Sequence, residues 1–243
     1  MDISSFSALF REIFLKTFPE YDTPLVTEKF FLLTNALCAA NEKMDLTAVT
    51  DPEQIILRHY ADCAYLAPLP PKNAVVADIG AGAGFPTLPL AILRPDLTVV
   101  AVDSTEKRMD YVAKTASALG LQVQTVVGRA EELGRDPEWR EKFDFVTARA
   151  VARLDVLCEL CLPLCRIGGT FCAMKAVDGP QEAQESRNAM EILGGSSPRL
   201  VQYDLPGLSD GAEKRCLVIC DKDAPTPGKY PRRFARIRKD PLQ

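Results

Sequence analysis

The 243-residue chain has no apolar run that approaches the roughly 20 residues of a membrane span. It also lacks the basic-then-apolar start of a secretory signal. These two absences predict a protein of the cytoplasm, and a composition of 47% apolar and 26% charged residues is that of a globular protein. The formal charge is −4, so the chain as a whole also lacks the positive charge of a general nucleic-acid binder.

The charge is unevenly spread along the chain. Residues 224–243 hold six basic side chains and a single acid, for a net charge of +5, so the remaining residues carry −9. The six are Lys229, Arg232, Arg233, Arg236, Arg238 and Lys239. Such asymmetry predicts a basic tail that binds an anion, although the chain as a whole is acidic.

Residues 73–86 predict a buried strand that leads straight into a glycine-rich turn. Residues 74–79 are apolar except for one acid, as in a parallel strand covered on both faces. Gly80, Gly82 and Gly84 follow at every second position, ahead of an apolar segment suited to a helix. Glycine allows a positive φ and the close approach of a ligand, and the first N–H groups of a helix are free. We therefore expect a ligand at this turn.

The glycine spacing distinguishes between two kinds of cofactor. A dinucleotide loop has the form G-x-G-x-x-G/A, and here its last position falls on Phe85 or Thr87. What remains is D-x-G-x-G-x-G from Asp78, a pattern typical of methyltransferases that use S-adenosyl-L-methionine (SAM). We expect Asp78, Gly80 and Gly82 to lie against the cofactor. A glycine-rich turn without a ligand is the alternative.

An acid at the end of the next strand supports the SAM interpretation. Residues 97–102 predict a second buried strand, and Asp103 follows it, 23 residues after Gly80. A carboxylate at this point can accept hydrogen bonds from two ribose hydroxyls. Alternatively the acid is only a helix cap, a role that Ser104 could fill equally well. The combined spacing favours SAM over NAD, with Asp103 and Ser104 as cofactor contacts.

Eight cysteines raise the question of a metal site. Cys158, Cys161 and Cys165 form the closest cluster, but their order is the reverse of the C-x3-C-x2-C of radical-SAM enzymes, and zinc would need a fourth ligand nearby. Spacings of three and four residues place side chains on one helix face, and free cysteine behaves as a small buried hydrophobe. We expect these cysteines to pack in the core, and we expect no bound metal.

Strands and helices alternate beyond residue 68, which predicts an α/β fold with a doubly wound, mostly parallel seven-stranded sheet and helices on both faces. This is the Rossmann-like architecture of class I SAM methyltransferases. The expected strands are residues 75–79, 99–102, 123–127, 143–147, 169–174, 200–204 and 215–220. The last two have a short connection through Pro206 and Gly207, which predicts an antiparallel hairpin at the sheet edge.

The residues before the sheet predict a helical appendage. Phe6 to Phe14 carry one apolar face, a second helix begins at Thr23-Pro24 and runs to about Ala40, and a third covers residues 52–66. A proline-rich segment at residues 68–71 then marks a junction. The expected division is residues 1–67 as appendage, 68–223 as the methyltransferase domain and 224–243 as a basic tail.

Several motifs, taken together, resemble one known family. They are Asn41–Val49, Arg58-His59-x2-Asp62, Asp78–Pro86, Asp103-Ser-x2-Lys107-Arg108, Gly128–Glu131, Ala148–Ala150 and Lys229–Arg232. They are similar to the bacterial small-subunit (16S) rRNA guanine-N7 methyltransferases, formerly named glucose-inhibited division protein B. The resemblance covers nearly the whole chain in the same order. It implies SAM as cofactor and 16S rRNA or the small ribosomal subunit as partner; we expect a monomer that binds no membrane.

The resemblance implies SAM contacts at Gly80, Phe85, Ala130, Glu131 and Arg149. Ala130 and Glu131 follow the third strand, where they could meet the adenine edge, although Glu131 could equally be the acidic start of a helix. Arg149 follows the fourth strand, where substrate and cofactor meet in this fold. Its planar fork could bind the methionine carboxylate, a phosphate or the target base, and we assign it the catalytic role.

The expected RNA contacts are Arg58, Lys175, Arg232 and Arg233. For the lone histidine, His59, we expect a packing role rather than catalysis, with contact to RNA left open. We further expect that removal of residues 225–243 weakens RNA binding and leaves the affinity for SAM intact.

The expected chemistry is in-line displacement of the SAM methyl group. Guanine N7 carries a lone pair and no proton, so the enzyme needs alignment and charge stabilisation but no general base. Residues 147–150 lack the Asn/Asp-Pro-Pro-Tyr/Phe motif of adenine-N6 transfer and the Pro-Cys pair of cytosine-C5 transfer. Two alternatives stay open: a SAM-dependent methyltransferase of a small molecule or protein, and a SAM-responsive RNA-binding protein without turnover. The basic tail favours RNA.

Overall fold

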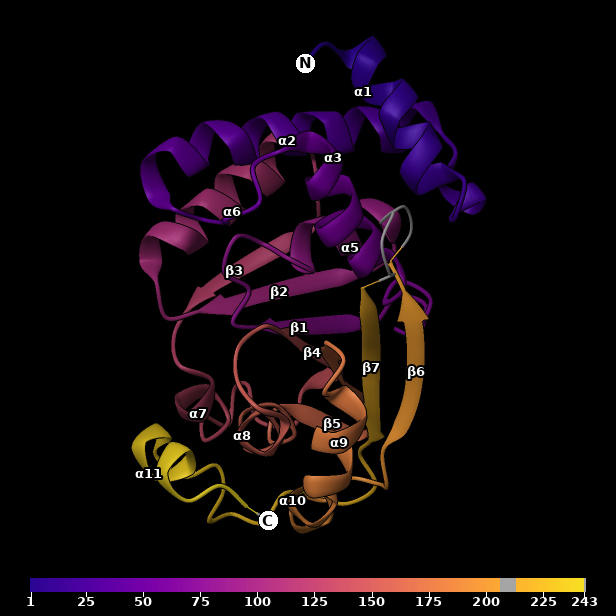
Figure 1. Cartoon of the computed structure of the whole chain (residues 1–243). Helices are drawn as coiled ribbons and strands as arrows, with labels where there is room; N and C mark the ends of the chain where they lie inside the picture. Colours follow the sequence, from indigo (N-terminus) through magenta and orange to yellow (C-terminus); the bar gives the residue numbers. More distant parts are fainter. Residues whose placement is uncertain (206–212, 243) are drawn as a thin grey trace.

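A seven-stranded sheet forms the centre of the computed structural model, which describes residues 1–205 and 213–242 (Figure 1). The strand order is β3-β2-β1-β4-β5-β7-β6, with β7 antiparallel to both of its neighbours and the other pairings parallel. The strands are β1 (Val75–Ile79), β2 (Thr98–Asp103), β3 (Val123–Val127), β4 (Phe143–Arg149), β5 (Cys165–Lys175), β6 (Arg199–Asp204) and β7 (Lys214–Asp221).

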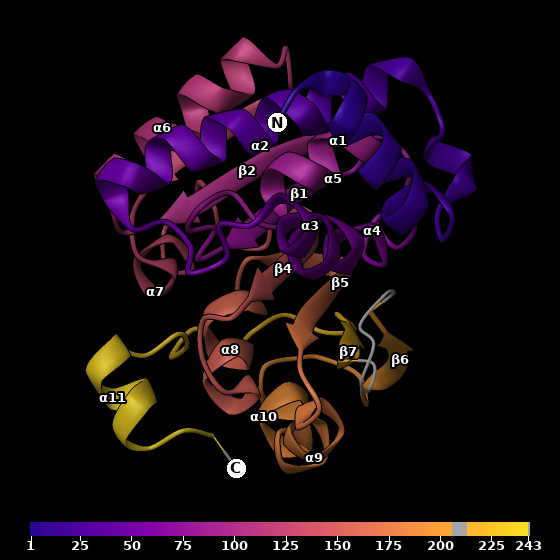
Figure 2. The same ribbon diagram turned by 45° about the horizontal axis from the view of Figure 1, so that its top comes forward.

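Helices cover both faces of this sheet, as the sequence predicts. The first group is α1 (Ile3–Phe10), η1 (Arg11–Leu15), η2 (Pro19–Tyr21), α2 (Pro24–Met44), α3 (Pro52–Ile55), η3 (Ile56–Ala61), α4 (Asp62–Ala64), α5 (Thr87–Leu93) and α6 (Glu106–Ala118). The second group is α7 (Ala130–Leu133), α8 (Leu154–Cys161), α9 (Gly179–Glu185), α10 (Arg187–Ile192) and α11 (Phe234–Lys239). Figure 2 shows α8 to α11 on the opposite side of the sheet from α1 and α2.

The hydrophobic core consists of two clusters, one on each face of the sheet. Neighbouring strand residues alternate between them: Val76 and Val99 belong to the first cluster, and Ala77 and Val100 belong to the second. This is the period of two that a strand imposes on its side chains. Both faces are apolar, so the central strands carry nearly continuous apolar runs.

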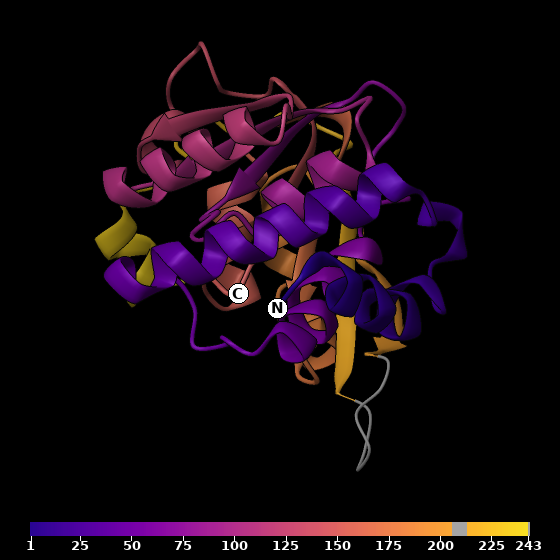
Figure 3. The same cartoon turned by 90° about the horizontal axis from the view of Figure 1, so that it is seen from above.

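The N-terminal helices belong to the first cluster, because their aromatic side chains pack together above the sheet. Phe10 stacks on Phe14, and Phe30 lies 4.6 Å from Tyr60 between ring centroids. Figure 3 shows α2 crossing over this face as one long helix. One continuous core therefore joins residues before and after the proline-rich junction. The division at residues 67 and 68 stays a prediction.

Most predicted elements are confirmed, and the differences lie at their ends. β1 and β3 have the predicted bounds, α2 begins at Pro24 with Thr23 capping Val26 N, and β6 pairs antiparallel with β7 at the sheet edge. The connection predicted through Pro206 and Gly207 lies outside the described residues. β5 begins four residues early, at Cys165, where its pairing with β4 is irregular.

The helix predicted for residues 52–66 is confirmed as a helical stretch from Pro52 to Ala64, but it is not a regular α-helix throughout. Its middle turns, Ile56–Ala61, are π-helical. Such a wide turn is rare and is frequently found at functional sites. Here it carries Arg58 and His59.

The packing interpretation of the cysteine cluster is confirmed. Cys158, Cys161 and Cys165 are buried in the second core cluster. Burial raises the pKa of the Cys158 and Cys161 thiols well above the ordinary value, so both stay protonated. Within residues 1–205 and 213–242, no group of three histidine, cysteine or acidic side chains could hold a metal ion. No helix in the same ranges is long and apolar enough to cross a membrane.

Candidate functional site

Two adjoining cavities lie at the carboxyl ends of the parallel strands, where open α/β sheets bind their ligands. The first, which we call the Asp103 cavity, has a volume of about 320 Å³. The second, the Arg149 cavity, has a volume of about 450 Å³. Ala150, with a φ of 56°, lines both, so the two cavities are neighbours.

The Asp103 cavity brings together most of the residues predicted to bind the cofactor. Its lining includes Gly80, Asp103, Ser104, Ala130 and Glu131, which follow three different strands. These positions are far apart in sequence, and the sheet places them side by side because β1, β2 and β3 are neighbours. The site expected from motif spacing is therefore a cavity in the folded chain.

The Asp103 carboxylate is fixed by backbone donors. Its Oδ2 accepts a hydrogen bond from Gly82 N at 3.1 Å, and its Oδ1 accepts one from Thr105 N at 2.8 Å. Each carboxylate oxygen can accept a second bond. The side chain is 8% exposed and lines the cavity, where Arg108 Nη1 lies 3.9 Å from Oδ2. This geometry suits a pair of ribose hydroxyls.

The three glycines of the loop have different reasons to be glycine. A Cβ at Gly80 would collide with Val151, and a Cβ at Gly84 would lie 2.7 Å from the Leu88 side chain. At Gly82 the nearest atom to such a Cβ is Gly80 O, at 3.8 Å, so the space beside it is open. Its φ of 56° also disfavours other residues. Packing explains two of the glycines, and the third leaves room for a ligand.

Asp78 presents an unpaired oxygen beneath this loop. Its Oδ2 accepts hydrogen bonds from Thr87 N at 3.1 Å and Thr87 Oγ1 at 2.6 Å. The other oxygen, Oδ1, is buried and has no hydrogen-bond partner among the described residues. Burial raises the pKa of this carboxyl to about 6, against the hydrogen bonds from Thr87. A buried unpaired acceptor calls for a partner, and an ammonium group such as that of SAM would supply one.

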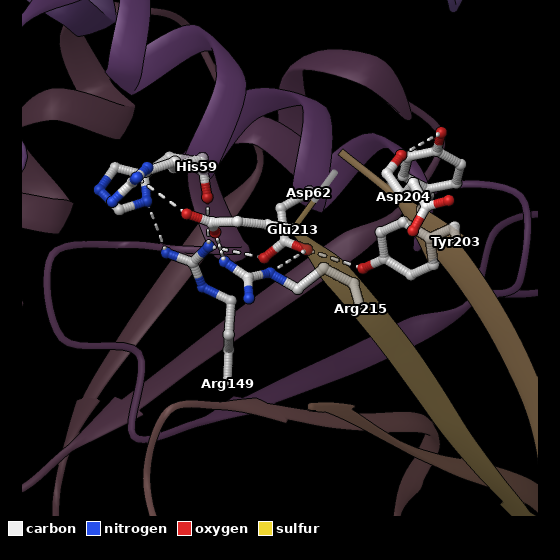
Figure 4. Close-up of polar contacts among 9 residues, drawn as sticks. His59, Asp62, Arg149, Tyr203, Asp204, Glu213 and Arg215 are labelled. Atoms are coloured by element: carbon white, nitrogen blue, oxygen red, sulfur yellow. Dashed lines mark hydrogen bonds and ion pairs between the residues drawn. The ribbon is translucent and has the colours of Figure 1, made fainter. Parts of the chain in front are cut away.

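Arg149 lines the second cavity and makes several polar contacts there (Figure 4). Its Nη1 donates to Asp62 Oδ2 at 2.9 Å and to the Arg58 carbonyl at 3.2 Å. The guanidinium carbon also lies 5.4 Å from the centroid of the Phe85 ring. The side chain is only 15% exposed, so this charge is held rigidly between the end of β4 and the N-terminal helices.

Asp62 lines the same cavity and contacts side chains from three different strands. Besides Arg149, it binds Tyr203 OH at 2.7 Å and lies 3.7 Å from Arg215 Nε, both through Oδ1 (Figure 4). These partners come from β4, β6 and β7. Burial and Asp62 together raise the pKa of Tyr203, so its hydroxyl stays a donor. In the sequence, Asp62 belongs to the motif Arg58-His59-x2-Asp62, from which no function was predicted for it.

His59 is neutral and bonded on both ring nitrogens. Nδ1 lies 3.0 Å from Arg149 Nη2, and Nε2 lies 3.1 Å from Thr47 Oγ1. Because a guanidinium only donates, Nδ1 accepts and the proton is on Nε2. Burial, and then the charge of Arg149, lower the pKa of His59 to about 3. Its ring stacks on Phe85, with centroids 4.5 Å apart, as the predicted packing role requires.

Phe85 lies with His59 and Arg149 and does not line the Asp103 cavity. Its contact with SAM stays a prediction.

The four predicted RNA contacts divide into two pairs. Arg58 and Lys175 line the Arg149 cavity. Lys175 Nζ there lies 2.9 Å from Glu182. Arg232 and Arg233 line neither cavity, and Arg232 binds the fully buried Glu159.

The C-terminal tail contributes to the cofactor side of the site. Phe234, the first residue of α11, lines the Asp103 cavity together with the cofactor motif residues. The geometry therefore argues against the expectation that residues 225–243 can be removed without effect on SAM affinity. Composition shows the charge of a tail but not where its aromatic residue packs.

The chain matches the family model described as rRNA small subunit methyltransferase G over residues 26–205. The ribosomal RNA small subunit methyltransferase G of Lactobacillus delbrueckii subsp. bulgaricus is 42% identical over 239 residues, which is 95% of this chain and 99% of that protein. The protein of the same name from Exiguobacterium sibiricum is 47% identical over 206 residues, 83% of this chain and 85% of its own length.

Solved structures show the same fold at low sequence identity. A SAM-dependent O-methyltransferase from Thermotoga maritima aligns with a TM-score of 0.50 and 14% identity, over 77% of this chain and 71% of that one. TYW2 of M. jannaschii, solved in complex with AdoMet, aligns with a TM-score of 0.52 and 17% identity, over 66% and 74% of the two chains.

Proposed function

Because the chain belongs to the rRNA small subunit methyltransferase G family, we propose that it transfers a methyl group from SAM to N7 of a guanine in 16S rRNA. The observation that carries this proposal is that the two cavities are neighbours, with Ala150 in the lining of both. One is lined by the SAM motif, and the other is lined by three arginines and a lysine. A methyl group held in the first would face a nucleic-acid base in the second.

Four features suit the cofactor, two in the lining of the Asp103 cavity and two, at Asp78 and Gly82, beside it. Asp103 would accept from the ribose hydroxyls, the unpaired oxygen of Asp78 would bind the ammonium group, and Ala130 with Glu131 would meet the adenine. The open space beside Gly82 would receive the chain between them. When bound, SAM supplies a methyl group on a positively charged sulfur.

The Arg149 cavity is suited to alignment rather than proton transfer. His59 Nδ1 is occupied by Arg149, and the low pKa of its ring makes it a poor base. Guanine N7 needs none, because it carries a free lone pair. Asp62, the Arg58 carbonyl and His59 take three of the five N–H donors of Arg149. The others would donate to guanine O6 and leave N7 free to react.

The remaining proposals concern the setting of the enzyme. We place it in the cytoplasm, where small ribosomal subunits are present, and we propose that it acts as a monomer. Arg58, Lys175 and Arg233 are the proposed contacts to RNA. Arg232 is better explained as an anchor of the tail, because its guanidinium is bound to Glu159.

The direct test is to incubate the protein with methyl-labelled SAM and 16S rRNA, both as naked RNA and in small subunits. We expect label on one guanine, which should become sensitive to strand cleavage after reduction, as 7-methylguanine is. Label at another atom of the base would contradict N7 transfer. Tight binding of RNA and SAM without any label would favour a binding protein.

Replacement of Asp103 by alanine should weaken SAM binding by about 1–3 kcal/mol, because two ribose hydroxyls would lose a charged acceptor. Calorimetric titration with SAM measures this loss. Asp110→Ala is the matched control, because Asp110 is exposed on α6 outside the Asp103 cavity. Equal affinity of both variants for SAM would remove Asp103 from the site, and micromolar binding of NAD by the wild type would overturn the cofactor assignment.

The affinity for SAM should depend on pH through Asp78. Its pKa of about 6 means that the carboxylate is charged above this pH and neutral below it. We expect constant affinity at higher pH and a loss of up to about tenfold per unit as the pH falls below 6, since one proton opposes binding. Asp78→Asn should bind weakly with a flat profile. A step near pH 6 that persists in this variant would show that a group other than Asp78 titrates.

A further inference from the structure

Three charged side chains at the mouth of the Arg149 cavity form a bridge. Arg58 Nη2 lies 2.8 Å from Glu213 Oε1. Arg215 Nη2 lies 2.6 Å from Glu213 Oε2 (Figure 4). The two carboxylate oxygens thus bind two different arginines. Arg58 and Arg215 line the cavity, one from η3 and the other from the start of β7. Elements distant in sequence therefore present two guanidinium groups to one small anion.

The bridge is accessible to solvent. The exposed fractions are 41% for the Arg58 side chain, 23% for Arg215 and 29% for Glu213. Ion pairs that solvent reaches are weak, so the phosphate of a bound RNA can compete with the carboxylate for the two arginines. Nε of Arg58 is buried and has no hydrogen-bond partner among the described residues, which leaves one donor of this arginine unused. The guanidinium fork matches phosphate as well as it matches carboxylate.

The position of the pair favours the substrate over the cofactor. The Asp103 cavity lies over β1, β2 and β3, on one side of β4. Arg215 is on β7, two strands away on the other side of β4, which is about 10 Å at the usual strand spacing. A nucleotide whose base lay beside Arg149 would have its phosphates outside the cavity, where the partly exposed bridge could meet one of them.

We propose that Arg58 and Arg215 form a phosphate site for the RNA strand that carries the target guanine, and that Glu213 occupies this site until a phosphate displaces it. This inference rests on the proposed function. It adds that Glu213 competes with the RNA phosphate for the two arginines. Without RNA, the carboxylate separates two like charges and holds both arginines in the orientation that a phosphate needs. With RNA, Glu213 turns to solvent.

The test compares the affinity of the full-length variants for 16S rRNA over a range of salt concentrations. Glu213→Gln keeps the shape and removes the competing charge, so it should bind RNA about three- to tenfold more tightly. Arg58→Ala and Arg215→Ala should bind more weakly, and each should reduce the slope of log affinity against log salt by about 0.7. A gain of affinity in the glutamine variant cannot come from misfolding.

Arg199→Ala provides the matched control. Arg199, on β6, pairs with Asp221 at 3.0 Å, at the end of β7 opposite to Arg215. This variant should leave RNA affinity and its salt slope unchanged. If Glu213→Gln bound RNA no better than wild type, or if the arginine variants kept the full slope, the phosphate site would be refuted. If the wild type transferred the methyl group normally, those results would refute this inference alone. A wild type that transfers no methyl group would refute the proposed function.

Discussion

Replacement of Arg149 by alanine should lower the rate of methyl transfer by on the order of 100-fold or more, because a reaction without proton transfer depends mainly on alignment. The guanidinium lies at the end of β4, next to the residue shared by both cavities. It is held there by Asp62, His59 and the Arg58 carbonyl. Single-turnover measurement with labelled SAM would separate this effect from binding.

A loss of folding must be distinguished from a loss of alignment. Arg149→Ala leaves the buried Asp62 with Tyr203 and the more distant Arg215 as its partners among the described residues, which costs stability. The double variant Arg149→Ala/Asp62→Asn removes this uncompensated charge. We expect it to recover most of the melting temperature and none of the rate. Recovery of the rate would show that Arg149 only neutralises Asp62.

Arg149→Lys should restore part of the rate, since a point charge cannot reproduce a planar fork. If the alanine variant methylated rRNA at nearly the wild-type rate, Arg149 would have no role in positioning. The groups to test would then be Lys175, which lines the same cavity, and Arg153, which follows Arg149 by four residues and is 61% exposed.

The fold and the family were predictable because their signals are local. The D-x-G-x-G-x-G loop and Asp103 each follow a strand directly, and the backbone of a parallel sheet places such positions at one edge. The match to the rRNA small subunit methyltransferase G model confirms the resemblance drawn from these motifs. Local order in the chain thus indicated the motif residues of the Asp103 cavity, but not the contribution of Phe234 from the tail.

The Arg149 cavity was less predictable because its contacts are distant in sequence. Asp62 binds Arg149 and Tyr203 across 87 and 141 residues. Glu213 joins Arg58 to Arg215 across a similar distance. No periodicity or spacing encodes such pairs. The available signal was Asp62 itself, an acid among apolar helix positions, since a buried carboxylate needs a partner.

The tail illustrates the limit of counting charges. Its six basic residues predict an arm of +5, but the structure uses Arg232 to bind Glu159 and Arg236 to bind Asp240. Other parts of the chain also hold the tail: Arg140 donates to the carbonyls of Tyr230 and Thr226. Composition cannot tell a solvated cation from one that is paired inside the fold.

Replacement of Arg232 by alanine should therefore act mainly on stability. Glu159 is fully buried on α8 and accepts hydrogen bonds from Arg232 N at 2.6 Å, Nε at 2.9 Å and Nη2 at 2.7 Å. Removal of the guanidinium leaves a buried carboxylate without its countercharge, at a cost of about 3 kcal/mol. For a chain of this size, the melting temperature should fall by roughly 6–12 °C.

Arg233→Ala is the matched control for this prediction, because the neighbouring arginine is exposed. It should leave the melting temperature unchanged and weaken RNA binding in a salt-dependent manner. Arg232→Ala should also weaken SAM binding, since detachment of the tail moves Phe234 from the wall of the Asp103 cavity. If the two variants melted alike and lost RNA affinity alike, the tail would be the basic arm that its composition predicts. If Arg232→Ala lowered the melting temperature and Arg233→Ala lowered only RNA affinity, the two adjacent arginines would have different roles: Arg232 would fix the tail to α8, and Arg233 would bind RNA.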